Sequence, residues 1–73
     1  SILRFKVIHL TANGNTLLEP LQHKEPIAKK RILMFNNKKV GEVFDTIANV
    51  DNPLYLAKTT KVENENILEC KVN

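Results

Sequence analysis

Turn-forming residues divide this chain into short apolar runs, and this pattern excludes most helical folds. Residues 1–10 and 31–47 alternate apolar with polar side chains and are rich in β-branched or aromatic residues. No window of eleven or more residues keeps an apolar stripe at the helical period of 3.6 between the breakers. Such alternation is typical of half-buried strands, so we expect an all-β fold.

The same turn signals divide the chain into six expected strands. Asn13 and Gly14 form the strongest hairpin signal, because both tolerate the positive φ of a tight turn. Pro20 ends its strand by removing a backbone donor, and 36–38 (Asn-Asn-Lys) predicts a second hairpin turn. Gly41 lies inside a strand, which indicates a bulge or a close backbone approach. The expected strands are residues 1–10, 15–19, 31–35, 39–47, 54–59 and 67–72.

The length of 73 residues suits one domain with one core. Six short strands without a covering helix favour a small antiparallel barrel, because closure removes unpaired strand edges. A chain of this length has an expected radius of gyration of about 11 Å, which leaves little depth for a ligand pocket inside the core. We therefore expect a single β-barrel over residues 1–73 that acts through its outer surface and is not an enzyme.

Single residue types narrow the expected chemistry further. Cys70 is the one cysteine, and His9 and His23 are the two histidines, so neither an internal disulfide nor a zinc framework is expected. With only Gly14 and Gly41, the sequence contains no phosphate-binding glycine motif. We expect no catalytic residue, metal or cofactor. The absence of a long apolar stretch or a signal-peptide pattern predicts a soluble cytoplasmic protein without membrane contact.

The formal net charge of +3 is unevenly distributed along the chain. Residues 1–40 hold eight basic and two acidic side chains, and residues 41–73 hold three basic and six acidic ones. One side could then face phosphate while another faces protein. Five cations could form one RNA-proximal cluster across the second hairpin: Lys29, Lys30, Arg31, Lys38 and Lys39. Three interpretations stay open, namely a solvated face, peripheral RNA contact in a larger assembly, and autonomous RNA binding.

Residues 48–53 contain many turn formers and predict an exposed loop. An apolar set surrounds this loop: Ile47, Val50, Pro53, Leu54 and Tyr55. If several of these side chains cannot turn inward, they form an exposed patch of the kind that binds a partner. In the alternative interpretation, they close the open end of the barrel.

A longer motif covers the same segment. Six residues fit, without a gap, the run Gly-x-Val-x-Asp-Val-Phe-Gly-Pro-Val-x-x-Pro-Tyr-x-x-x-Lys: Gly41, Val43, Asp45, Val50, Pro53 and Lys58. In this run the chain resembles the archaeal form of the glycine-arginine-rich (GAR) accessory subunit of H/ACA ribonucleoproteins, as a core without glycine-arginine tails. Ile47, Ala48 and Asn49 replace the Phe-Gly-Pro of that family, and Tyr55 lies one place after its tyrosine.

The resemblance implies a six-stranded antiparallel barrel related to translation-factor domains, acting as a noncatalytic subunit in rRNA pseudouridylation. Its direct partner would be the catalytic domain of the dyskerin-type pseudouridine synthase, and guide RNA and substrate rRNA would be present in the same complex. The subunit would influence a mobile loop that holds or releases substrate RNA. By position, the resemblance assigns Gly41, Val43, Val50 and Pro53 to the interface or its support, and the apolar loop adds Ile47, Leu54 and Tyr55.

Two alternatives to this function stay open. The first is an autonomous RNA-binding barrel that uses the five cations. The second is a barrel domain of a ribosome maturation factor or translation factor, cut from a longer chain.

Overall fold

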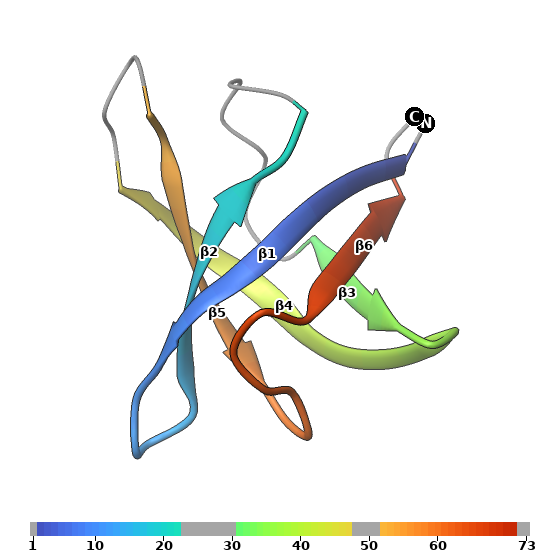
Figure 1. Ribbon diagram of the computed structural model, residues 1–73. Helices are drawn as coiled ribbons and strands as arrows, with labels where there is room; N and C mark the ends of the chain where they lie inside the picture. The colour runs from blue at the N-terminus through green and yellow to red at the C-terminus, as the bar shows by residue number, and fades with distance from the viewer. Residues whose placement is uncertain (1, 23–30, 48–51, 72–73) are drawn as a thin grey trace.

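The computed structural model describes residues 2–22, 31–47 and 52–71, and their regular structure is entirely β-strand (Figure 1). The all-β expectation is therefore confirmed, with strand bounds within about two residues of those expected from the sequence. No helix of the described residues is long and apolar enough to cross a membrane. The strands are β1 (Ile2–Leu10), β2 (Asn15–Pro20), β3 (Ile32–Phe35), β4 (Lys38–Ile47), β5 (Leu54–Thr59) and β6 (Ile67–Lys71).

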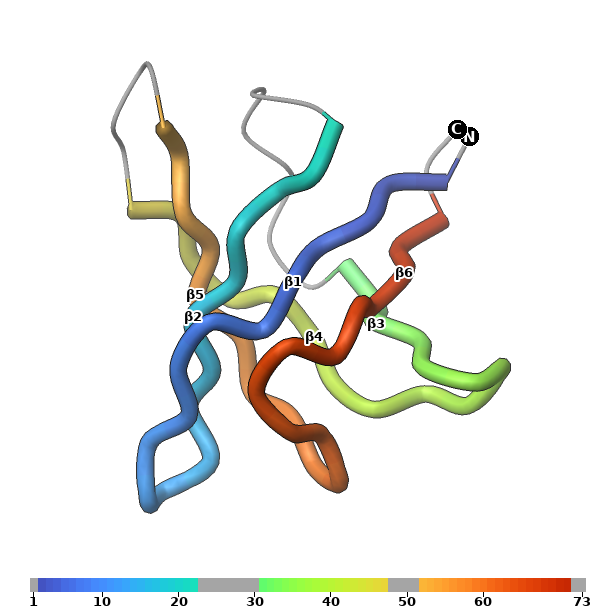
Figure 2. Tube along the Cα trace, in the orientation of Figure 1, coloured from blue at the N-terminus to red at the C-terminus, as the bar shows by residue number. Residues whose placement is uncertain are grey.

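The six strands form a closed antiparallel barrel in the order β1-β2-β5-β4-β3-β6, which confirms the expected architecture. Strand β5 pairs with both β2 and β4, and β6 pairs with both β1 and β3 (Figure 2). The seam between β3 and β6 is short, since Met34 and Glu69 are its one register pair. The Cα radius of gyration is 10.9 Å, close to the value expected for one compact core.

The interior of the barrel is filled by alternate residues of all six strands. Phe5 and Tyr55 are its largest members, and their rings pack edge to face with centroids 5.3 Å apart. Among the described strands, the buried apolar residues are Phe5, Val7, Leu18, Leu33, Val40, Val43, Tyr55, Ala57, Leu68 and Cys70. Thr16 is also buried, and its hydroxyl satisfies its hydrogen-bonding need through the hydroxyl of Thr59.

The two expected hairpin turns differ in how closely they follow the sequence signal. Asn36 and Asn37 both have positive φ, 52° and 65°, and form a two-residue turn between paired Phe35 and Lys38. In the first turn, residues 11–14 separate β1 from β2, as the expected strand bounds imply, but only Gly14 of the Asn13-Gly14 pair has positive φ. The amide of Asn15 donates to the Thr11 hydroxyl over 3.0 Å, which stabilises this loop.

Three β-bulges bend the described strands, with one extra residue each at Ile8, Val40 and Phe44. Each bulge increases the local twist and changes which face the following residues occupy. Gly41 lies between the two bulges of β4, where a Cβ would be 2.8 Å from the Thr59 methyl carbon and inside contact distance of the Lys58 carbonyl oxygen. The predicted close backbone approach at Gly41 is therefore present.

Candidate functional site

Four of the seven residues assigned to the interface from the sequence have structural positions in the barrel. Val43 and Tyr55 are fully buried core residues, and Pro53 is buried just before β5. Gly41 permits the close approach of β4 to β5. Tyr55 and Pro53 thus turn inward and support the barrel, as in the end-closing interpretation of the apolar loop. Val50 lies outside the described residues.

The other two members, Ile47 and Leu54, face outward. They are register partners at the end of the β4–β5 pair, and 45% of Ile47 is exposed. Tyr55, the residue after Leu54, faces the core, so strand alternation places Leu54 on the outer face. These two side chains form one end of a larger apolar surface.

The larger surface includes two leucines that the sequence analysis missed. Leu17 of β2 and Leu56 of β5 are register partners, and each lies between buried neighbours on its own strand. Both therefore point away from the core and are half-buried on the outer side. Leu54 and Leu56 are two residues apart on β5 and share this face, so aliphatic side chains continue across three neighbouring strands. We call Leu17, Leu56, Leu54 and Ile47 the outer apolar strip.

Polar side chains surround the outer apolar strip. His9 of β1 pairs with Leu17, and Asp45 of β4 pairs with Leu56, and both polar residues are exposed. Asp45 also accepts a hydrogen bond from the Thr46 amide over 2.8 Å. An apolar centre with a polar rim is the usual composition of a protein–protein interface.

The expected five-cation cluster is not assembled over the described residues. Arg31 precedes β3, whereas Lys38 and Lys39 follow the turn at the other end of that strand. Lys39 pairs with Met34, so about 10 Å of strand separates it from the level of Arg31. Lys29 and Lys30 lie outside the described residues. The second hairpin thus separates the described members of the cluster into two locations.

The basic and acidic halves of the sequence are interleaved in the barrel. Arg4 pairs with Glu69 at 3.4 Å, Lys6 with Glu65 at 3.9 Å, and Lys39 with Glu42 at 3.1 Å. Each of these pairs joins a residue from 1–40 to one from 41–73. Over the described residues, ion pairs therefore join the two halves of the sequence, and Lys6 also lies 4.0 Å from Glu19 of its own half.

Within the described ranges, the remaining chemistry-bearing side chains do not form a metal-binding group. Cys70 is fully buried, and desolvation raises the pKa of its thiol, with partial opposition from the positive charge of Arg31. A neutral buried thiol packs as a small apolar side chain. Among the described residues, no three His, Cys, Asp or Glu side chains lie close enough to hold a metal ion.

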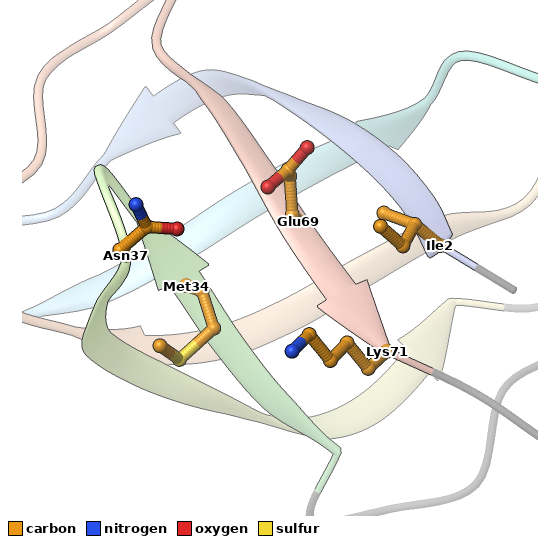
Figure 3. Close-up of a pocket in the computed structure, with 5 residues that line it drawn as sticks. All are labelled: Ile2, Met34, Asn37, Glu69 and Lys71. Carbon is orange, nitrogen blue, oxygen red and sulfur yellow. The ribbon is translucent and has the colours of Figure 1, made fainter.

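A hollow of about 210 Å³ lies on the outside of the β3–β6 seam (Figure 3). Lys71 extends from β6 toward Met34 of β3, and Glu69 lies further along β6. The carboxylate of Glu69 already pairs with Arg4. Ile2 and Asn37 complete the lining of the hollow.

Comparisons with family models, with curated proteins and with solved structures gave no match for this chain. The outer apolar strip is therefore identified from geometry alone. A sequence signal for it exists, because Leu17-Leu18 and residues 54–57 are apolar at consecutive positions. In a strand, consecutive apolar residues place at least one of them on each face.

Proposed function

We propose that this chain is a noncatalytic subunit of the H/ACA ribonucleoprotein that docks on the pseudouridine synthase through its outer apolar strip. The observation that carries the proposal is the continuous aliphatic surface formed by Leu17, Leu56, Leu54 and Ile47 on three adjacent strands. Contiguous exposed apolar surface with a polar rim is characteristic of interaction sites. The surface gives a partner protein an apolar area to bury without requiring a pocket.

The choice of partner rests on the resemblance of residues 41–58 to the GAR subunit. The described part of this segment forms most of β4 and β5, the strands that carry Ile47, Leu54 and Leu56. Its inward residues, Val43 among them, hold these strands in the barrel. The segment therefore carries three of the four residues of the outer apolar strip, and Leu17 lies on the neighbouring strand β2, which supports the synthase as partner.

Docking alone is sufficient to alter the turnover of an enzyme. A subunit that contacts two conformations of a substrate-holding loop with different affinity shifts the balance between them. Loop opening and product release limit the rate of many enzymes, so this shift changes the rate of multiple turnover. We propose that the chain aids loading or release of substrate RNA in this way during rRNA pseudouridylation.

The test compares two isoleucines of similar exposure on different faces of the barrel. Ile47 is 45% exposed in the outer apolar strip, and Ile67 is 38% exposed on β6. Ile47→Asp should weaken binding to a purified dyskerin-type synthase by at least about tenfold, because a carboxylate would be desolvated in the interface. Ile67→Asp, the matched control, should bind as the unmodified chain does. Calorimetric titration gives both affinities.

Pro53→Asp is not an informative variant, because Pro53 is buried and the substitution would disturb folding. Leu56→Asp provides a second variant on the strip, with circular dichroism as the check of folding. The proposal fails if the unmodified chain does not bind the synthase. It also fails if the Ile47 and Ile67 variants lose equal affinity, since the interface would then lie elsewhere.

A further inference from the structure

Phe44 is the aromatic residue that the barrel turns outward. The other three aromatic side chains face the interior: Phe5 and Tyr55 are fully buried, and Phe35 packs partly buried against the core. Phe44 is the extra residue of the β4 bulge, between buried Val43 and exposed Asp45, and 36% of it is exposed. The bulge therefore places an aromatic ring on the surface of a chain that needs its other rings for the core.

Two lysines lie beside this ring. The ammonium of Lys58 on β5 is 5.9 Å from the centroid of Phe44, near the outer limit of a cation–π contact. Lys39 borders the same hollow, where its ammonium pairs with Glu42 at 3.1 Å. This hollow has a volume of about 420 Å³ and is shallow and open to solvent. Its lining is Lys39, Gly41, Glu42, Phe44, Lys58 and Thr60.

An exposed aromatic ring with adjacent ammonium groups suits one class of ligand in particular. A nucleobase stacks on the ring with little dependence on its identity, and the phosphate next to it pairs with lysine. The contact of Lys58 with Phe44 is long, so its ammonium can move to a phosphate without losing a strong interaction. The hollow contains the positive charges of Lys39 and Lys58 and the negative charge of Glu42. Its net charge is therefore one positive charge, which favours a single phosphate.

We infer that the outer face of β4 and β5 binds one nucleotide of a single-stranded nucleic acid, with the base on Phe44 and a phosphate on Lys58 and Lys39. The site differs from the five-cation cluster expected from the sequence, because it combines one of those cations with Phe44 and Lys58. The site shares no residue with the outer apolar strip, but it adjoins the strip, since Lys58 lies two positions from Leu56 on the same face of β5.

The probes are fluorescein-labelled oligonucleotides of about eight nucleotides, as RNA and as DNA, titrated with the chain at about 50 and 200 mM salt. Fluorescence anisotropy gives the affinity. Phe44→Leu, which keeps an apolar side chain but removes the ring, should weaken binding by about fivefold or more. Phe44→Tyr keeps the ring and should bind as the unmodified chain does. The relative affinity for RNA and DNA identifies the natural strand.

Lysine variants test the phosphate contact. Lys58→Gln should reduce the slope of log affinity against log salt by about 0.7, the value for one single-strand phosphate. Lys71→Gln, an equal charge change on β6, should leave the slope unaltered. Affinity of Phe44→Leu within about twofold of the unmodified chain would overturn the inference. Equal effects of the two lysine variants, or affinity weaker than about 1 mM at low salt, would overturn it as well.

Discussion

Replacement of Gly41 by alanine tests the packing of β4 against β5. A Cβ at this position would overlap the Lys58 carbonyl oxygen and lie 2.8 Å and 2.9 Å from the Cγ2 and Cα atoms of Thr59. The carbonyl and Cα atoms belong to the backbone of a paired strand, so a side-chain rotation cannot relieve the overlap. The variant can be accommodated only if β4 and β5 move apart and lengthen the hydrogen bonds between them.

The loss of stability expected for Gly41→Ala depends on how little the backbone atoms of Lys58 and Thr59 can move. Insertion of a methylene into a packed core costs about 1–3 kcal/mol when side chains can shift, and a backbone overlap lies at the top of that range or above it. We expect Gly41→Ala to lower the free energy of unfolding by about 3 kcal/mol or more. A chain of this length has a total stability of about 4–11 kcal/mol, so much of it would be lost.

Gly14→Ala is the matched control, because it makes the same chemical change where the new Cβ meets its neighbours at ordinary contact distance. Gly14 has a φ of 85°, and the nearest atom to its Cβ, the Thr59 carbonyl oxygen, is 3.8 Å away. The cost there is the left-handed backbone alone, about 1–2 kcal/mol. Urea unfolding followed by far-UV circular dichroism compares the two variants. A Gly41→Ala variant as stable as Gly14→Ala would refute the close packing of β4 and β5.

Two further predictions concern the core. Leu18→Ala should reduce the free energy of unfolding by about 2–5 kcal/mol, because Leu18 is fully buried. Leu21→Ala, the control, lies at a position 46% exposed and should change the free energy of unfolding by less than about 0.5 kcal/mol. Equal urea midpoints of the two variants would contradict the assigned core. The pKa of the Cys70 thiol is raised in the folded state, so the folded chain holds this proton more tightly than the unfolded chain. The thiol's contribution to the free energy of unfolding is complete below the unfolded pKa near 9.0 and is lost as the pH rises through the raised folded pKa. Urea midpoints between about pH 8 and 10 should therefore fall more for the unmodified chain than for Cys70→Ala, and parallel decreases would contradict the raised pKa.

The sequence predicted those parts of the fold that depend on local physics. Asn36 and Asn37 have the positive φ values that a two-residue turn needs, and few other residues adopt them readily. Asn13 does not behave in this way, because the Thr11 hydroxyl and carbonyl both accept hydrogen bonds within a wider loop. Thr11 lies outside the turn dipeptide, yet its hydroxyl bonds to both the Asn13 side chain and the Asn15 amide, and dipeptide signals do not include such a contribution.

The site could be predicted less completely, because the face of each apolar residue depends on strand pairing. Leu54, Tyr55 and Leu56 are all apolar, so alternation alone does not decide which of them faces the core. In the barrel, Tyr55 pairs with buried Leu18 on one side and Thr46 on the other, and this register turns Leu54 and Leu56 outward. Register between β2 and β5 joins residues about forty positions apart, beyond the reach of a local pattern.

The residues of the segment that resembles the GAR subunit fall into two groups in the barrel, one buried and one exposed. Val43 and Pro53 are buried, and Gly41 is packed against the backbone of β5, so these matches specify the β4–β5 pair of the barrel. Asp45 and Lys58 are exposed and lie beside the candidate surfaces. Substitution of the first group would disturb folding and binding together. Only outward-facing side chains, on the outer apolar strip or beside Phe44, can distinguish a partner-binding role from a structural one.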